Sequence, residues 1–127
     1  MALMPDKKQV SSIETGKKGE EQAVSALKAA GMKIIAQNYR CKTGEIDIIA
    51  LDGETVVFIE VKAWSFYGME DLQYGIDTRK QNKIIKTAKY FLLENRQYSK
   101  MSNRFDVVFV KNNSITHLAS AFMEGVL

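Results

Sequence analysis

Hydrophobic and polar residues follow two different periods along this chain. Residues 12–30 have the helical period, and Gly31 follows as a natural stop. We therefore expect a first helix here, after a loose N-terminal tail at residues 1–11. A second helical pattern extends to about Glu94 and begins after Asp77, a residue suited to the N-cap position. The chain is therefore expected to contain two long helices.

The segments between and after these helices have the pattern of strands. Several are apolar at successive positions, which is typical of strands in a sheet that is covered on both faces. Asp52-Gly53 is a hairpin signal between two of them. The expected strands lie near residues 34–39, 45–51, 56–61, 105–110 and 115–118.

This order of elements predicts an α/β fold, with a mixed sheet flanked by helices. The 127 residues, 46% of them hydrophobic, suit one domain, which we place at residues 12–127. No apolar stretch approaches the roughly 20 residues of a membrane-spanning helix. Residues 1–10 do not resemble a secretion signal, so we expect a cytoplasmic protein without a membrane partner.

The residue inventory limits the chemistry that is available. Cys41 is the only cysteine and His117 the only histidine, which argues against a disulfide framework, a structural zinc site and a Cys/His nucleophilic pair. A metal would therefore be held by oxygens. The net charge of +3 permits a nucleic-acid partner without requiring one.

Charged residues interrupt two of the apolar strands. Alternation places Glu60 and Lys62 on one face of their strand, and Glu45 and Asp47 on one face of the preceding strand. A two-residue turn at Asp52-Gly53 would set Glu45 opposite Glu60. A loop two residues longer would set Asp47 opposite Glu60, and in both registers the four charged side chains share a face.

Acids placed together on an apolar hairpin repel one another, so a cation is expected among them. Lys62 supplies one positive charge, and Mg²⁺ or Mn²⁺ suits a small set of oxygen ligands. Glu20 joins this group from the inward stripe of the first helix. The same residues also fit a structural role, in which Glu60 and Lys62 form a strand-end pair, and the pattern leaves both interpretations open.

Two resemblances extend this interpretation. Asp47 followed by Glu60-Val61-Lys62 resembles the PD-(D/E)XK nuclease superfamily. Five motifs within about residues 14–111 also resemble the YraN family of small bacterial proteins, which is itself similar to archaeal Holliday junction resolvases. The motifs are G-x-x-G-E at 16–20, N-Y-R at 38–40, G-E-I-D-I-I-A at 44–50, F-I-E-V-K at 58–62 and R-F-D-V-V at 104–108.

The resemblance implies a restriction-endonuclease-like αβββαβ core and Mg²⁺-dependent phosphodiester hydrolysis. Asp47, Glu60 and the Val61 carbonyl would hold the metal, which lowers the pKa of a bound water. Lys62 would orient that water and offset the developing charge. Glu20 would bind a second metal or its water shell.

Further positions are expected to support the site. Lys80 and Gln81 resemble helix residues that assist the site in related nucleases, and Glu45 lies beside the acids. Two positions depart from the pattern: residue 46 is Ile where the superfamily name has proline, and Trp64 stands where relatives often carry arginine.

Basic residues form the expected nucleic-acid-binding surface. Arg79, Lys83 and Lys86 recur at helical spacing, a pattern equally typical of a solvated helix face. Arg40 of the N-Y-R motif and Trp64 complete this set. The aromatic residues of the following loop suit base stacking, core covering or a dimer contact. They are Phe66, Tyr67 and Tyr74.

The function expected from these observations is a metal-dependent nuclease acting on DNA, including branched or Holliday-junction-like DNA. Junction cleavage on two strands would favour a homodimer. Two alternatives remain: a catalytically inert nucleic-acid-binding module on the same fold, and a protein-interaction scaffold that uses the aromatic loop.

Overall fold

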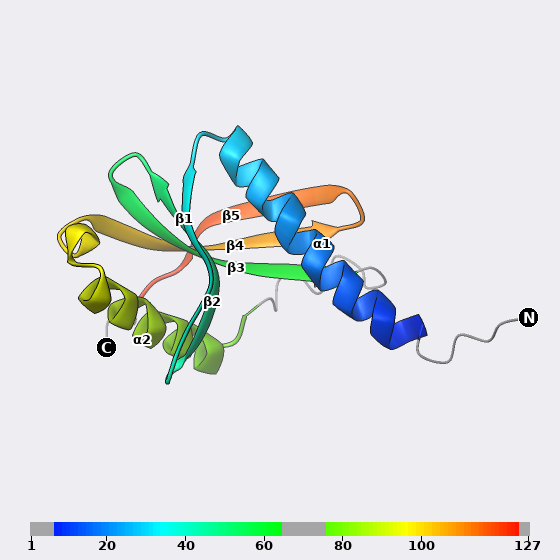
Figure 1. Ribbon diagram of the computed structural model, residues 1–127, viewed down its shortest axis with the longest axis horizontal. Helices are drawn as coiled ribbons and strands as arrows, with labels where there is room; N and C mark the ends of the chain where they lie inside the picture. Colours follow the sequence, from blue (N-terminus) through cyan, green and yellow to red (C-terminus); the bar gives the residue numbers. More distant parts are fainter. Residues whose placement is uncertain (1–6, 65–75, 125–127) are drawn as a thin grey trace, which may run out of the picture.

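The computed structural model describes residues 7–64 and 76–124 and confirms the expected α/β domain. Five strands form one sheet between two helices (Figure 1). The elements are α1 (Lys7–Ala29), β1 (Lys33–Cys41), β2 (Gly44–Asp52), β3 (Thr55–Trp64), α2 (Thr78–Glu94), the short 3-10 helix η2 (Arg96–Tyr98), β4 (Ser102–Lys111) and β5 (Ser114–Phe122).

The sheet is mixed, as the pattern predicted. Its strands follow the order β1-β2-β3-β4-β5, so every strand lies beside its neighbour in sequence. β3 and β4 are parallel, whereas the other three pairs are antiparallel. A parallel pair requires a long crossover, and α2 lies within this one.

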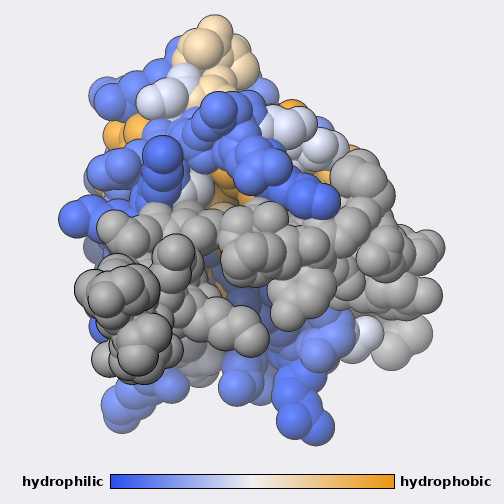
Figure 2. Space-filling model, turned by 90° about the vertical axis from the view of Figure 1, so that its right-hand side faces the viewer, coloured by the Kyte–Doolittle hydropathy of each residue, from blue (hydrophilic) through white to orange (hydrophobic). Residues whose placement is uncertain are grey.

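Each face of the sheet has its own hydrophobic core. Ala23 and Leu27 of α1 pack with Ile48 and Ile59 on one face, whereas α2 packs with Phe58 and its neighbours on the other. On the side shown in Figure 2, the coloured surface is mainly hydrophilic and hydrophobic atoms appear in small areas. Within the described ranges, neither helix combines the length and apolar character that crossing a bilayer requires.

The ends of α1 and α2 differ in how well the sequence predicts them. α2 begins after the N-cap Asp77, whose carboxylate accepts the Lys80 N–H (2.9 Å), as expected. α1 begins at Lys7, earlier than the expected start at Ser12, because residues 7–11 favour a helix without carrying an apolar face. Residues 1–6 of the expected tail lie outside the described residues.

The β2–β3 hairpin has the second of the two registers considered. Asp52 pairs with Thr55, so the turn residues are Gly53-Glu54, and the register centred on Asp52-Gly53 is wrong. Gly53 adopts φ +61, a conformation that glycine allows and that the first turn position of this tight hairpin requires.

A buried carboxylate joins β4 to β5. Asp106 is fully buried; its carboxylate pairs with Arg104 (3.0 Å), contacts His117 Nε2 (2.7 Å) and accepts the Ser120 N–H (2.9 Å). Arg104 also pairs with Asp52 on β2 (2.9 Å). This network gives the R-F-D-V-V motif and the single histidine a structural role.

Gly19 allows α1 to lie close to β3. A Cβ atom at Gly19 would overlap the Cβ of Ala63, whereas one at Gly16 would meet no atom within 4 Å. Close approach therefore requires glycine at only one of these two helical positions.

This difference predicts opposite effects of two alanine substitutions. Gly19→Ala should lower the free energy of unfolding by about 1–3 kcal/mol, because the added methyl overpacks the contact between α1 and β3. Gly16→Ala should raise it by about 0.5–1 kcal/mol, because alanine favours a helix over glycine. Urea unfolding of both variants measures these changes, and equal effects would contradict the packing explanation.

Candidate functional site

β2 and β3 separate at Asp47. Their pairing ends at Ile48 and Ile59, after which β2 remains paired with β1 and β3 with β4. Beyond this point, the backbone N–H of Val61 donates to Asp47 Oδ2 (2.8 Å). The carboxylate thus accepts a hydrogen bond from the Val61 N–H at a position where β2 no longer pairs with β3.

The alternation of side chains also changes at Asp47. Ile48 packs in the core beneath α1, but Ile46, two residues earlier, packs in the core beneath α2. Opposite Asp47 on β1 lies Asn38, which adopts φ +53. Simple alternation, from which a shared face for Glu45 and Asp47 was predicted, therefore does not hold between Ile46 and Ile48.

Asp47 and Glu60 form the centre of the site. Burial first, and then the charge of Glu60, raises the pKa of Asp47 from its usual 3.8 to about 7. A hydrogen bond between the two carboxyl groups acts in the same direction, whereas the Val61 N–H and Lys80 oppose the shift. Asp47 therefore holds its proton to a much higher pH than an ordinary aspartate does.

Lys80 is the cation that neutralises this pair. Its Nζ lies 2.6 Å from Oε2 of Glu60, whose side chain is only 8% exposed. Burial acts to lower the pKa of Lys80, but its hydrogen bond and charge interaction with Glu60 outweigh burial and raise it. Lys62 was expected to supply this charge, yet in the described part of the chain it forms no ion pair.

Glu20 approaches the same cluster from α1. Burial raises the pKa of Glu20, and the charges of Asp47 and Glu45 raise it further. A hydrogen bond with the Asn38 side chain acts in the opposite direction. Asn38 was not identified as a site residue, although the N-Y-R motif contains it and asparagine tolerates positive φ better than most residues.

The other expected residues lie around the cluster. Glu45 is exposed and pairs with Arg40 across β1 and β2 (2.8 Å). The side-chain amide of Gln81 donates through its Nε2 to the Ile76 carbonyl (3.0 Å). The expected nucleic-acid-binding positions of α2 are exposed on the helix surface. They are Arg79, Lys83 and Lys86.

Some residues with predicted roles lie outside the described structure. The backbone of Trp64 ends β3, but its side chain is not among the described parts. The aromatic residues of the loop at 65–75 are the others, so their proposed stacking or contact roles are not addressed by the structure.

The donor set at the centre fits a divalent cation with few protein ligands. In the described ranges, no three Asp, Glu, His or Cys side chains form a ready metal cage. Asp47 and Glu60 nevertheless bring two carboxyl groups together, which are hard oxygen donors of the kind that a divalent cation prefers. Mg²⁺ binds through one or two carboxylates and retains waters, which matches this set.

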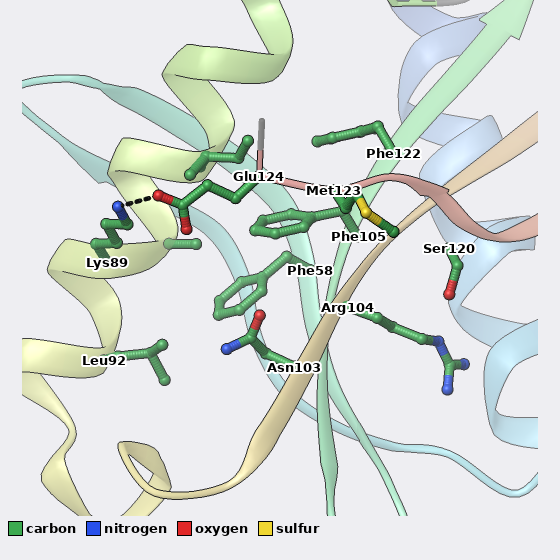
Figure 3. Close-up of a pocket in the computed structure, with 12 residues that line it drawn as sticks. Phe58, Lys89, Leu92, Asn103, Arg104, Phe105, Ser120, Phe122, Met123 and Glu124 are labelled. Atoms are coloured by element: carbon green, nitrogen blue, oxygen red, sulfur yellow. Dashed lines mark hydrogen bonds and ion pairs between the residues drawn. The ribbon is translucent and has the colours of Figure 1, made fainter. Parts of the chain in front are cut away.

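A separate apolar recess lies between α2 and the β3–β5 part of the sheet (Figure 3). Its volume is about 210 Å³, and stacked Phe58, Phe105 and Phe122 rings form part of its wall. The Lys89–Glu124 ion pair spans its rim (2.6 Å). None of the acids of the cluster lines this recess, so it is distinct from the candidate site.

Comparison with known proteins places the site within a shared region. Residues 19–110 match the family described as "Uncharacterised protein family UPF0102". A UPF0102 protein of Persephonella marina is 42% identical over 107 residues, covering 84% of this chain and 91% of the relative. One from Treponema denticola is 44% identical (84% and 93% covered), and one from Pseudomonas fluorescens is 38% identical (94% and 98% covered).

The raised pKa of Asp47 predicts an unusual pH dependence of stability. The folded protein holds the proton of Asp47 up to about pH 7, whereas the unfolded chain loses it near pH 3.8. Unfolding therefore releases a proton between these values, and stability falls as the pH rises through this range. Between these pH values, the free energy of unfolding of Asp47→Asn should fall by about 2–4 kcal/mol less than that of the wild type. Each pKa unit corresponds to about 1.4 kcal/mol.

The measurement is urea unfolding at pH 5 and pH 8 in the presence of EDTA. Glu54→Gln, in the exposed turn, is the matched control and should retain the wild-type dependence. An Asp47→Asn protein with an unchanged dependence on pH would show that Asp47 titrates normally.

Proposed function

This chain belongs to the UPF0102 family, and we propose that it is a metal-dependent nuclease of the PD-(D/E)XK type that hydrolyses phosphodiester bonds in DNA. The observation that carries this proposal is the Asp47–Glu60 pair, held at the point where two strands separate. Buried acids with a raised pKa and a nearby lysine are typical of a catalytic site rather than of a sheet interior.

The metal would bind between the carboxyl groups of Asp47 and Glu60. Asp47 and Glu60 would provide carboxylate oxygens, and the carbonyl of Val61 would be a third protein donor. When bound, Mg²⁺ or Mn²⁺ would lower the pKa of a water ligand and polarise the phosphate. The protein's own contribution is to hold both carboxylates in place, through the Val61 N–H on Asp47 and the Lys80 ammonium on Glu60.

Two further residues would act on the substrate side. Lys62 follows Glu60 on the same strand and, among the described residues, has no ion-pair partner that would compete for its ammonium. It would orient the attacking water and offset charge on the phosphate. Glu20, held by Asn38, would accept hydrogen bonds from waters near the metal.

Metal binding can be measured without any activity. At pH 6 Asp47, with its pKa of about 7, carries a proton that the metal must displace, so Mn²⁺ binding should release about one proton. Titration calorimetry in buffers of different ionisation enthalpy measures this number. Asp47→Asn should lose both the binding and the proton release, whereas Glu54→Gln should retain them. Binding without proton release would place the metal elsewhere.

Cleavage tests the proposal directly. We expect Mg²⁺- or Mn²⁺-dependent cutting of end-labelled duplex, flap or four-way-junction DNA, with EDTA abolishing it. Lys62→Ala should reduce the rate about 100-fold or more while urea unfolding shows an intact fold. Lys28→Ala, at the distant end of α1, is the control and should cut normally.

The outcomes separate the alternatives. Cutting that survives Lys62→Ala would remove the assigned role of this lysine. An absence of cutting on every DNA and RNA substrate, with salt-sensitive binding retained, would instead identify an inert nucleic-acid-binding module. Absence of binding would favour the protein-interaction scaffold.

A further inference from the structure

We propose that an open basic pocket at the β1–β2 turn holds a backbone phosphate of the substrate strand, next to the phosphate that lies at Asp47 and Glu60. This inference rests on the proposed function and specifies how the substrate is held. The pocket has a volume of about 450 Å³. It is lined by Arg40, Cys41, Lys42, Thr43, Gly44, Glu45 and Lys83.

The charges of the lining favour an anion. Arg40 is paired with Glu45, so these two largely cancel. Lys42 and Lys83 are both exposed, and within the described ranges neither forms an ion pair. Two positive charges from different elements therefore face one hollow without an acidic partner, which is the arrangement that a phosphate group neutralises.

The shape and composition favour the backbone of a strand over a base. The lining contains no aromatic ring on which a base would stack and no large aliphatic side chain that would enclose one. Its polar groups are ammonium, guanidinium and hydroxyl groups, which bind phosphate oxygens and sugars without reading sequence.

The two lysines are held on one surface by a hydrogen-bonded clamp. The Thr87 hydroxyl donates to the Lys83 carbonyl (2.8 Å), so its oxygen is left to accept the proton of the Thr43 hydroxyl (2.8 Å). Gly44 adopts φ +146 beside this clamp, and a Cβ there would lie 3.4 Å from Thr87 Oγ1. The β1–β2 turn is therefore fixed against α2, so Lys42 and Lys83 do not depend on a mobile loop for their relative position.

The pocket adjoins the acidic cluster. Glu45 lines the pocket and lies only two residues before Asp47 on β2. Lys80 and Lys83 lie three residues apart on α2 and so project from adjacent turns. A strand whose phosphate lies at the cluster would therefore extend over the pocket. The substrate class that fits this arrangement is a polynucleotide that continues beyond the cleavage point, rather than a mononucleotide.

Binding without metal tests the pocket separately from catalysis. The double variant Lys42→Ala/Lys83→Ala is compared with Lys28→Ala/Lys100→Ala, which removes the same charge at exposed positions outside the pocket. Fluorescence anisotropy with labelled single-stranded DNA, duplex DNA and RNA is measured in EDTA between 50 and 200 mM KCl. The pocket variant should bind about tenfold more weakly, with the salt slope reduced by about 1.5, whereas the control should retain the wild-type slope.

Equal losses in both double variants, or no loss in either, would overturn the inference. Restoration of affinity by Lys42→Arg/Lys83→Arg would support a role for charge, and its failure would point to a disturbed turn instead. Wild-type binding in EDTA without cutting in Mg²⁺ would sustain the pocket and refute the nuclease. If the pocket variant cuts DNA as well as the wild type does, the nuclease is supported and the role of the pocket is refuted.

Neutral linkages locate the contact along the strand. In a substrate that is cut at one position, single phosphates are replaced in turn by methylphosphonate. Wild-type protein should lose affinity at one phosphate flanking the cut, and the pocket variant should show no further loss at that phosphate. Additive losses from the variant and the neutral linkage would show that the lysines contact a different phosphate or none.

Discussion

A single carboxylate that replaces a strand partner determines the arrangement of this molecule. At Asp47, β2 and β3 part, and the Val61 N–H donates to the side chain where a neighbouring strand would otherwise have supplied a carbonyl. A buried N–H without a partner costs about 1–3 kcal/mol, so the carboxylate stabilises the separation that it occupies. The opening in the sheet and the principal acid of the site are therefore one feature.

The same position is reached from both faces of the sheet. Glu20 approaches from α1 and experiences the charge of Asp47, whereas Lys80 approaches Glu60 from α2 and its charge acts on Asp47. The cluster therefore assembles only when both helices are packed. Its carboxyl groups repel one another and oppose folding near neutral pH, while the apolar cores beneath the helices stabilise the fold. Such a division between a strained site and a stable scaffold is common in enzymes.

The sequence predicted the elements well, because each depends on local signals. α2 follows from Asp77 and its apolar stripe, and the strands follow from continuous apolar runs. The site was less predictable. Two hairpin registers had the same parity, and the observed pairing of Asp52 with Thr55 selects one of them. The choice of Lys80 over Lys62 as counter-ion depends on how α2 packs, which no local pattern contains.

The placement of basic residues around the acids has an electrostatic reason. A cluster of carboxylates repels a polyanionic strand, and a bound cation offsets this repulsion only at the point of contact. Charges a few ångströms away must therefore attract the rest of the strand without neutralising the acids themselves. The β1–β2 turn meets this requirement because Glu45 pairs with Arg40 on the side that approaches the cluster. In the proposed nuclease, Lys42 and Lys83 would present their charge to the strand, while burial and the charge of Glu60 keep the pKa of Asp47 raised.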